Sequence, residues 1–123
     1  MKKTPFIIIA FLLAALLMGQ LTTANNTNVK WSYTKQLTAE ENATAHWEKH
    51  KDEFPEFSSA AEYIKAANDF INNPPKGTKV KIEKDGDVLF YHPATNVFAV
   101  RAKTGVPRTM FKPDAGIDYW NRQ

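Results

Sequence analysis

The chain has no cysteine among its 123 residues. Without thiols it can form neither a disulfide framework nor a lipid-modified cysteine anchor. An exported form of this chain would therefore depend on its hydrophobic core alone. The sequence also lacks internal repeats and low-complexity tracts, which indicates one small domain with one core.

A hydrophobic run long enough to cross a membrane is missing as well. The longest one, Phe6 to Met18, has about 13 residues, and a spanning helix needs roughly 20. The run follows two lysines and precedes the small residues Thr22-Thr23-Ala24, an arrangement typical of a secretory signal. We expect residues 1–24 to be a signal peptide cleaved after Ala24, and the mature protein to be secreted or periplasmic without stable membrane association. A retained membrane anchor is the competing interpretation.

The mature chain has no large excess of charge of either sign. Lys2 and Lys3 leave with the signal, so 14 basic and 13 acidic residues remain, a net charge of +1. Residues 25–75 carry five basic and eight acidic side chains, and residues 76–123 carry nine and five. A basic half on a nearly neutral domain favours a local anionic ligand over broad coating of nucleic acid. Uneven surface charge without a function is the alternative.

Two helices are predicted after a polar lead at residues 25–37. A T-x-x-E capping box at Thr38 predicts a helix that runs to about Phe54, before Pro55. An S-x-x-E box at Ser59 predicts a second helix, which the stretch NNPPKG ends. Apolar residues at helical spacing predict the buried faces: Ala43, Trp47, His50 and Phe54 in the first helix, and Tyr63, Ile64, Ala67, Phe70 and Ile71 in the second.

Four strands follow, because the apolar pattern changes to a period of two. The predicted strands are residues 79–84, 88–92, 97–103 and 106–111, with two-residue turns at Asp85-Gly86 and Thr104-Gly105. Helices first and a meander afterwards predict an α+β fold, with two N-terminal helices packed on one face of a four-stranded antiparallel sheet. The domain would then cover residues 38–123.

The last turn sets the register of the last two strands. A two-residue turn would pair Arg101 with Arg108, Val100 with Thr109, and Phe98 with Phe111. Two opposed arginines repel each other unless an anion lies between them, although a register error of one residue would remove this pair. We assign Phe98, Val100, Thr109 and Phe111 to the helix-covered face, which brings the Thr109 hydroxyl close to His50 and places Lys112 at the strand end.

The stretch HWEKHKDEF at residues 46–54 contains two histidines four residues apart. Such a pair can bind zinc, with His92 as a third ligand. In H-E-x-x-H metalloproteases, however, the glutamate directly follows the first histidine, whereas here it is the third residue. We therefore expect no metal and no other cofactor.

His50 lies on the apolar stripe, where a histidine is commonly a core residue satisfied by one hydrogen bond. It is flanked by Lys49 and Lys51, and a partly desolvated ring near cations stays neutral at physiological pH, as a general base must. The pair Tyr119-Trp120 near the C-terminus fits either base stacking or a hydrophobic clasp for the tail.

Four segments together resemble the C-terminal cytotoxic domain of colicin D and related bacterial polymorphic-toxin ribonucleases of the barnase, EndoU, colicin and RelE-like superfold. They are KHKDEF (49–54), the helix with Tyr63 and Phe70, FYHPATNVFAV (90–100) and G-x-x-R-T-M-F-K-P (105–113). The chain departs from colicin D at three places: Trp47 replaces a lysine, threonine and phenylalanine replace serine and tryptophan, and Pro55 replaces a glycine.

The resemblance implies a metal-independent endoribonuclease with RNA, tRNA included, as substrate. It implies His50 as the base that deprotonates a ribose 2′-hydroxyl, with Lys49 and Thr109 as further catalytic residues and a 2′,3′-cyclic phosphate as product. No acid is assigned; His50 alone, His46 and Tyr119 remain candidates. Substrate binding is expected from Arg101, Arg108, Phe111, Lys112 and Tyr119.

The resemblance also implies a toxin-like monomer with an acidic immunity or inhibitor protein as its partner. The alternative from another class is a non-catalytic exported module that binds an anionic ligand or a partner protein through the same surface.

Overall fold

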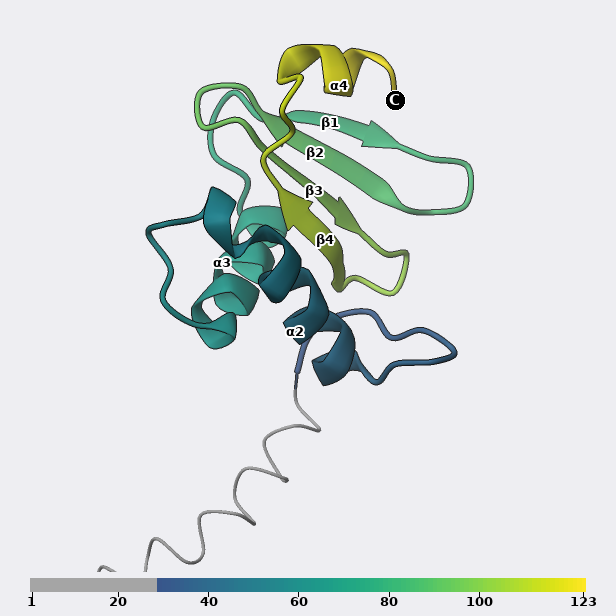
Figure 1. Ribbon diagram of the computed structural model, residues 1–123. Coiled ribbons are helices and arrows are strands. Elements are labelled where there is room, and N and C mark those ends of the chain that lie inside the picture. Colours follow the sequence, from purple (N-terminus) through teal and green to yellow (C-terminus); the bar gives the residue numbers. More distant parts are fainter. Residues whose placement is uncertain (1–28) are drawn as a thin grey trace, which may run out of the picture.

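The computed structural model describes residues 29–123, and the expected signal peptide lies outside the described residues. Helix α2 (Ala39–His50) is followed by a short 3-10 turn (Lys51–Glu53) and by helix α3 (Ala60–Asn72). Strands β1 (Lys79–Ile82), β2 (Val88–His92), β3 (Val97–Arg101) and β4 (Pro107–Phe111) come next, and helix α4 (Ile117–Asn121) ends the chain. The strands form one antiparallel sheet in the order β1-β2-β3-β4 (Figure 1). The predicted α+β meander is confirmed.

Helix α2 begins at the predicted capping box. The Thr38 side chain accepts a hydrogen bond from the Glu41 backbone N–H, and the Glu41 carboxylate accepts one from the Thr38 N–H. The regular helix ends at His50, four residues before the predicted end, and continues as the 3-10 turn up to Phe54. This tighter turn places the Glu53 carboxylate next to the His50 ring, where the two side chains are in contact.

The main core lies between the two long helices and one face of the sheet. Helix α3 packs on β3 and β4, and α2 packs on β4. The sheet contributes Val88, Phe90, Ala99 and Met110 to this core. The expectation that Phe98, Val100, Thr109 and Phe111 face the helices is therefore wrong: they lie on the opposite face. Buried helix residues in the core are Ala43, Trp47, Tyr63, Ala67 and Ile71.

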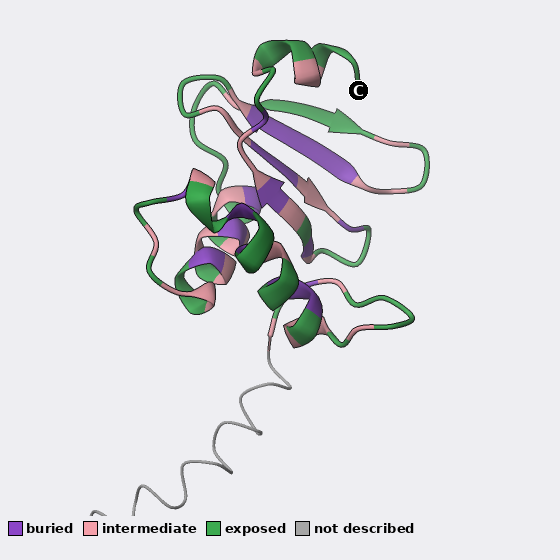
Figure 2. Ribbon diagram, in the orientation of Figure 1, coloured by how far each residue is buried: buried purple, intermediate pink, exposed green. Residues whose placement is uncertain are grey.

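The opposite face of the sheet has a second, smaller apolar cluster. Leu89, Tyr91 and Phe98 are its buried members, and Tyr119 and Trp120 of α4 pack against it. In Figure 2, β2 is buried along most of its length, whereas the edge strand β1 is exposed. This face is thus covered at one end by α4 and is open toward the hairpins at the other.

The segment before α2, expected as a polar lead, contributes to the domain. Trp31 is buried in the main core, and the Ser32 backbone N–H donates to the Pro107 carbonyl of β4. Within residues 29–123, no helix combines the length and the apolar character that crossing a bilayer requires.

The two tight hairpins each contain one residue more than predicted. Ala102 N–H donates to the Val106 carbonyl, so the loop is residues 103–105, with Gly105 at φ +98°. The corresponding loop before β2 has Gly86 at φ +96°. A β-carbon on Gly86 would lie 2.7 Å from the Lys103 β-carbon, so the two neighbouring hairpin loops require glycine there.

The longer loop changes the register near the turn only. Arg101 pairs with Pro107 instead of Arg108, and a bulge then restores the predicted pairs of Val100 with Thr109 and Phe98 with Phe111. The predicted Arg101–Arg108 pair is wrong, because the two arginines are no longer opposite each other. Arg108 is the extra residue in β4 between the two paired positions.

Candidate functional site

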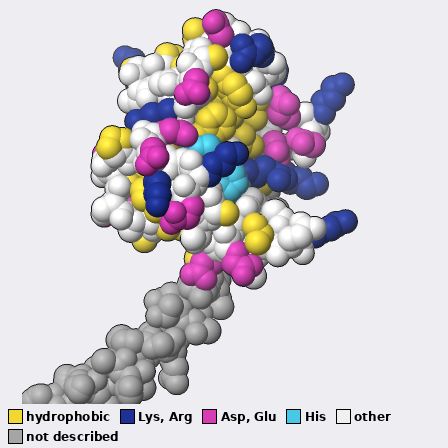
Figure 3. All heavy atoms as spheres, in the orientation of Figure 1, with side chains coloured by type: hydrophobic (Ala, Val, Ile, Leu, Met, Phe, Trp, Pro, Cys, Tyr) yellow, Lys and Arg dark blue, Asp and Glu magenta, His cyan; other side chains and the backbone are white. Residues whose placement is uncertain are grey.

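Helix α2 places two histidines where β4 meets the open face of the sheet. His46 and His50 are one turn apart and therefore share a face of the helix. Their ring centroids are 6.0 Å apart, with the planes inclined by 27°. Figure 3 shows histidine side chains at the surface between an apolar patch and several basic side chains. The imidazoles thus lie together at the rim of the second apolar cluster.

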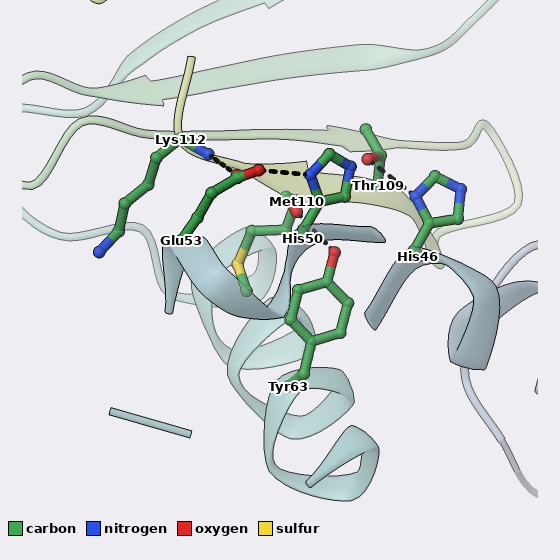
Figure 4. A network of polar contacts seen from close by, with 7 residues as sticks. All are labelled: His46, His50, Glu53, Tyr63, Thr109, Met110 and Lys112. Carbon is green, nitrogen blue, oxygen red and sulfur yellow. Dashed lines mark hydrogen bonds and ion pairs between the residues drawn. The ribbon is translucent and has the colours of Figure 1, made fainter. Parts of the chain in front are cut away.

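His50 is held by a carboxylate that follows it by three residues. Its Nδ1 atom lies 2.9 Å from Oε2 of Glu53, and its ring stacks on Phe111 with centroids 5.3 Å apart. The other Glu53 oxygen accepts a hydrogen bond of 2.8 Å from the Lys112 backbone N–H (Figure 4). Glu53 therefore connects the histidine to the end of β4 and fixes the ring orientation.

His46 has a different partner. Its Nδ1 atom lies 3.1 Å from the Thr109 hydroxyl oxygen, and its ring centroid is 5.6 Å from that of Trp31. Burial lowers the pKa of His46 below its usual value of 6.5, and the nearby His50 and Lys49 lower it further. The His46 ring is therefore neutral at physiological pH.

A groove of about 440 Å³ opens beside this pair. Its wall includes His46, Arg108 and Thr109 together with three carboxylates, those of Glu83, Asp85 and Asp87. His50 does not line it, and the His50 side chain is only 11% exposed. Of the two histidines, His46 is therefore the one that a molecule in the groove would contact.

The predicted basic residues lie in different places. Lys49 is exposed on α2, and Arg108 lines the groove while its Nε atom lies 3.0 Å from Oδ2 of Asp87. The Arg101 guanidinium lies over the Phe90 ring, 5.7 Å from its centroid. Since Phe90 belongs to the helix-covered face, the structure separates Arg101 from the histidines.

Lys112 contributes its backbone to the site, but its side chain extends elsewhere. The ammonium group lies 3.7 Å from Oε2 of Glu56 and 4.9 Å from the centroid of the Phe54 ring. In Figure 4 this side chain runs away from His50. The predicted role of the Lys112 ammonium in binding substrate therefore has no support from its position.

Phe111 and Tyr119 belong to the second apolar cluster. Tyr119 packs edge-on against Phe98 and Phe111, with centroids 5.1 and 5.5 Å apart, and Trp120 stacks on Tyr91 at 6.1 Å. These contacts fit the interpretation that Tyr119 and Trp120 fasten the C-terminal tail to the domain. One face of Phe111 is already occupied by the His50 ring, so Phe111 supports the histidine.

His92 lies away from the other two histidines. Its Nδ1 atom is 2.8 Å from the Thr95 hydroxyl and its Nε2 atom 3.2 Å from the Lys76 carbonyl. Among residues 29–123, no group of three or more His, Cys, Asp and Glu side chains is placed to hold a metal ion. His92 therefore does not complete a three-histidine set.

Glu53 belongs to the motif KHKDEF but was not expected as a site residue, and His46 was expected only as a candidate acid or metal ligand. The i, i+3 spacing of His50 and Glu53 was a usable signal, because residues three apart on a helix are neighbours. The hydrogen bond between His46 and Thr109 had no such signal, since the two residues are 63 positions apart.

No protein-family model matches this chain, and no curated protein matches it. A search of solved structures finds similarity to a chain of a structure described as a ribonuclease from Escherichia coli complexed with its inhibitor protein. The identity is 19% and the TM-score 0.45, over 64% of this chain and 95% of that chain. A function is therefore inferred from the geometry of the site.

Proposed function

We propose that the protein is an exported, toxin-like endoribonuclease that cleaves RNA without a metal. The 2′-hydroxyl of a ribose attacks the adjacent phosphorus, and the products are a 2′,3′-cyclic phosphate and a 5′-hydroxyl end. One observation carries this proposal: two imidazoles from one helix face, each fixed through Nδ1 by its own partner, lie 6.0 Å apart beside a groove.

This reaction needs one proton removed and one proton donated. Histidine is the side chain whose ordinary pKa allows both roles near neutral pH. His46 and His50 together provide the two groups. The alcohol, the phosphodiester and two imidazoles are sufficient reactants, so the mechanism requires no further cofactor.

Charge develops on the phosphate oxygens as the 2′-oxygen attacks. Lys49 stands on the histidine-bearing helix and Arg108 lines the groove, so both can approach a bound phosphate. The Thr109 hydroxyl, next to His46, can donate a hydrogen bond to one of its oxygens. Preorganised donors and cations of this kind stabilise the transition state.

The purified mature protein is expected to cleave total RNA in the presence of EDTA, and the shorter RNA products should end in 2′,3′-cyclic phosphates. The end groups are read by their sensitivity to phosphatase before and after acid opening of the ring. RNA with 2′-deoxy substitutions throughout is the control and should stay intact. Loss of cleavage in EDTA would contradict the metal-independent mechanism.

A binding module without catalysis is the second candidate. The observation in its favour is that His50 is buried and its Nδ1 atom is already satisfied by Glu53, as in an ordinary structural histidine. Intact RNA together with measurable binding of RNA would favour this module. Cleavage at discrete or progressive sites would exclude it.

Replacing Glu53 by glutamine is expected to lower RNA cleavage about tenfold or more. A hydrogen bond to a charged partner contributes about 1.5–3 kcal/mol, and the amide removes the charge from the contact with His50. Steady-state rates across pH 5–8 measure the effect, and the shape of the pH profile should change with the rate. Glu48→Gln is the matched control, because Glu48 is a nearby carboxylate on α2 that contacts Lys51 instead of a histidine; it should leave rate and profile unchanged.

The proposed ribonuclease would be exported and kept inactive by a partner. An acidic inhibitor protein suits the role, since its surface would compete with RNA for the basic side chains near the groove. Among RNAs, tRNA is the candidate suggested by the resemblance to colicin D, although Trp47 replaces a lysine of that domain.

A further inference from the structure

We propose that the two histidines divide the proton transfers, with His46 taking the proton from the 2′-hydroxyl and His50 giving one to the departing 5′-oxygen. The inference rests on the proposed ribonuclease function and assigns its two chemical roles. It reverses the expectation from the sequence that His50 is the base.

The partners of the two rings differ in charge. His50 Nδ1 lies against the carboxylate of Glu53, and His46 Nδ1 lies against the uncharged hydroxyl of Thr109. A general acid must carry a positive charge before the reaction, and an adjacent carboxylate offsets that charge. A general base starts neutral, so it needs no such partner.

The groups around His46 also favour a neutral ring. Lys49 and His50 approach it from its own helix, and Arg108 lies in the same groove. Glu83, Asp85 and Asp87 line the same groove, and Asp87 is paired with Arg108. Burial, and after it His50 and Lys49, lower the pKa of His46, so its second nitrogen is free to accept a proton at neutral pH.

Each ring has one nitrogen in use and one available. The Nδ1 atoms are occupied by Thr109 and Glu53, which leaves both Nε2 atoms for the substrate. In Figure 4 the two rings lie side by side, with Thr109 between them in this view. The 6.0 Å between ring centroids lets both rings approach oxygens of one phosphodiester.

The position of the groove indicates how the RNA strand would lie across the two histidines. It is lined by His46 and Thr109 but not by His50, so a nucleotide held in the groove would present its ribose to His46. The phosphorus would follow near Thr109, and the leaving nucleotide would extend past His50 toward Phe111.

In the reaction, Nε2 of His46 removes the proton of the 2′-hydroxyl while the 2′-oxygen forms a bond to phosphorus. The bond from phosphorus to the 5′-oxygen breaks, and the Nε2 proton of His50 passes to that oxygen. His46 ends protonated and His50 ends neutral, with its Nδ1 proton still donated to Glu53. Exchange of one proton each with water restores the starting state.

The test compares two short RNAs that differ in one atom. One has the natural 5′-oxygen at the scissile bond, and the other has sulfur in its place. A thiolate is a far weaker base than an alkoxide, with a thiol pKa of about 8.5, and it leaves without a proton donor. Initial rates of wild type, His46→Ala and His50→Ala are measured on both RNAs in EDTA.

We expect His50→Ala to lose about a hundredfold or more on the oxygen substrate and less than about tenfold on the sulfur substrate. His46→Ala should lose about a hundredfold on both, because sulfur does not help the attacking group. The two rates are compared within one variant, so a change in the folded fraction cancels. His92→Ala is the control and should behave as wild type on both RNAs.

Rescue of His46→Ala by sulfur, without rescue of His50→Ala, would overturn the assignment by exchanging the roles. Wild-type rates of His46→Ala on both RNAs would also overturn it, because His46 would then take no part. If wild type cleaves neither RNA, the ribonuclease proposal itself fails and this inference with it.

Discussion

Replacing His50 by alanine is expected to lower the rate of RNA cleavage by at least about a hundredfold, the smaller end of what a general acid or base contributes. The substitution removes the imidazole between Glu53 and Phe111 and leaves no titratable group at that position. The measurement is the initial rate on one RNA substrate in EDTA, at equal concentrations of variant and wild type.

His50→Gln and His92→Ala are the matched variants. Glutamine can still donate a hydrogen bond to Glu53 but cannot transfer a proton, so His50→Gln should lose as much activity as His50→Ala. His92 bonds to Thr95 and Lys76, and its removal should leave the rate unchanged. Because His50 is buried, circular dichroism must show that both His50 variants are folded. A folded variant with the wild-type rate would remove His50 from the mechanism.

Replacing Tyr63 by alanine is expected to lower the free energy of unfolding by roughly 3–5 kcal/mol, as for other large aromatic residues in cores. Tyr63 has no exposed surface, and its ring contacts those of Trp31, Trp47 and Phe54. A small domain is stable by only about 5–15 kcal/mol, so the loss is a large fraction of the total. Urea denaturation followed by fluorescence measures it.

Tyr63→Phe removes the hydroxyl and keeps the ring, so it measures the contribution of the hydroxyl to stability. The hydroxyl donates a hydrogen bond of 2.5 Å to the Met110 carbonyl (Figure 4), and its removal alone should cost about 1 kcal/mol. Tyr33→Ala is the surface control, because Tyr33 is 77% exposed, and it should change stability by less than about 0.5 kcal/mol. A loss below 1 kcal/mol in Tyr63→Ala would show that this core tolerates a cavity.

The register of the last hairpin shows how a correct prediction can arise from two compensating errors. The turn was expected to have two residues and has three, which moves the partner of Arg101 from Arg108 to Pro107. A bulge at Arg108 adds one residue to the same strand and restores the pair of Val100 with Thr109. A period of two in the sequence does not reveal a bulge, since the residues beyond it keep their alternation.

The prediction of which sheet face meets the helices was wrong for a related reason. Strand β3 has apolar residues on both faces, so alternation alone does not say which face meets the helices. The helix-covered face carries Phe90 as well as the smaller Ala99 and Met110, and they share the main core with Trp47 and Tyr63. The larger Phe98 and Phe111 pack instead with aromatic residues of α4. Which face meets the helices depends on how all the side chains of the core pack together, and a linear pattern does not contain this information.

The sequence by itself determined the order and type of the elements, the start of both long helices and the burial of His50, because capping boxes and apolar periods act over a few residues. Only the tertiary structure decided which groups surround that histidine. Its approach to Phe111, the bond between His46 and Thr109, and the separation of Arg101 from the site all depend on how α2 packs along β4. Contacts between distant segments follow from side-chain volume and strand register, so they appear only when the whole core is assembled.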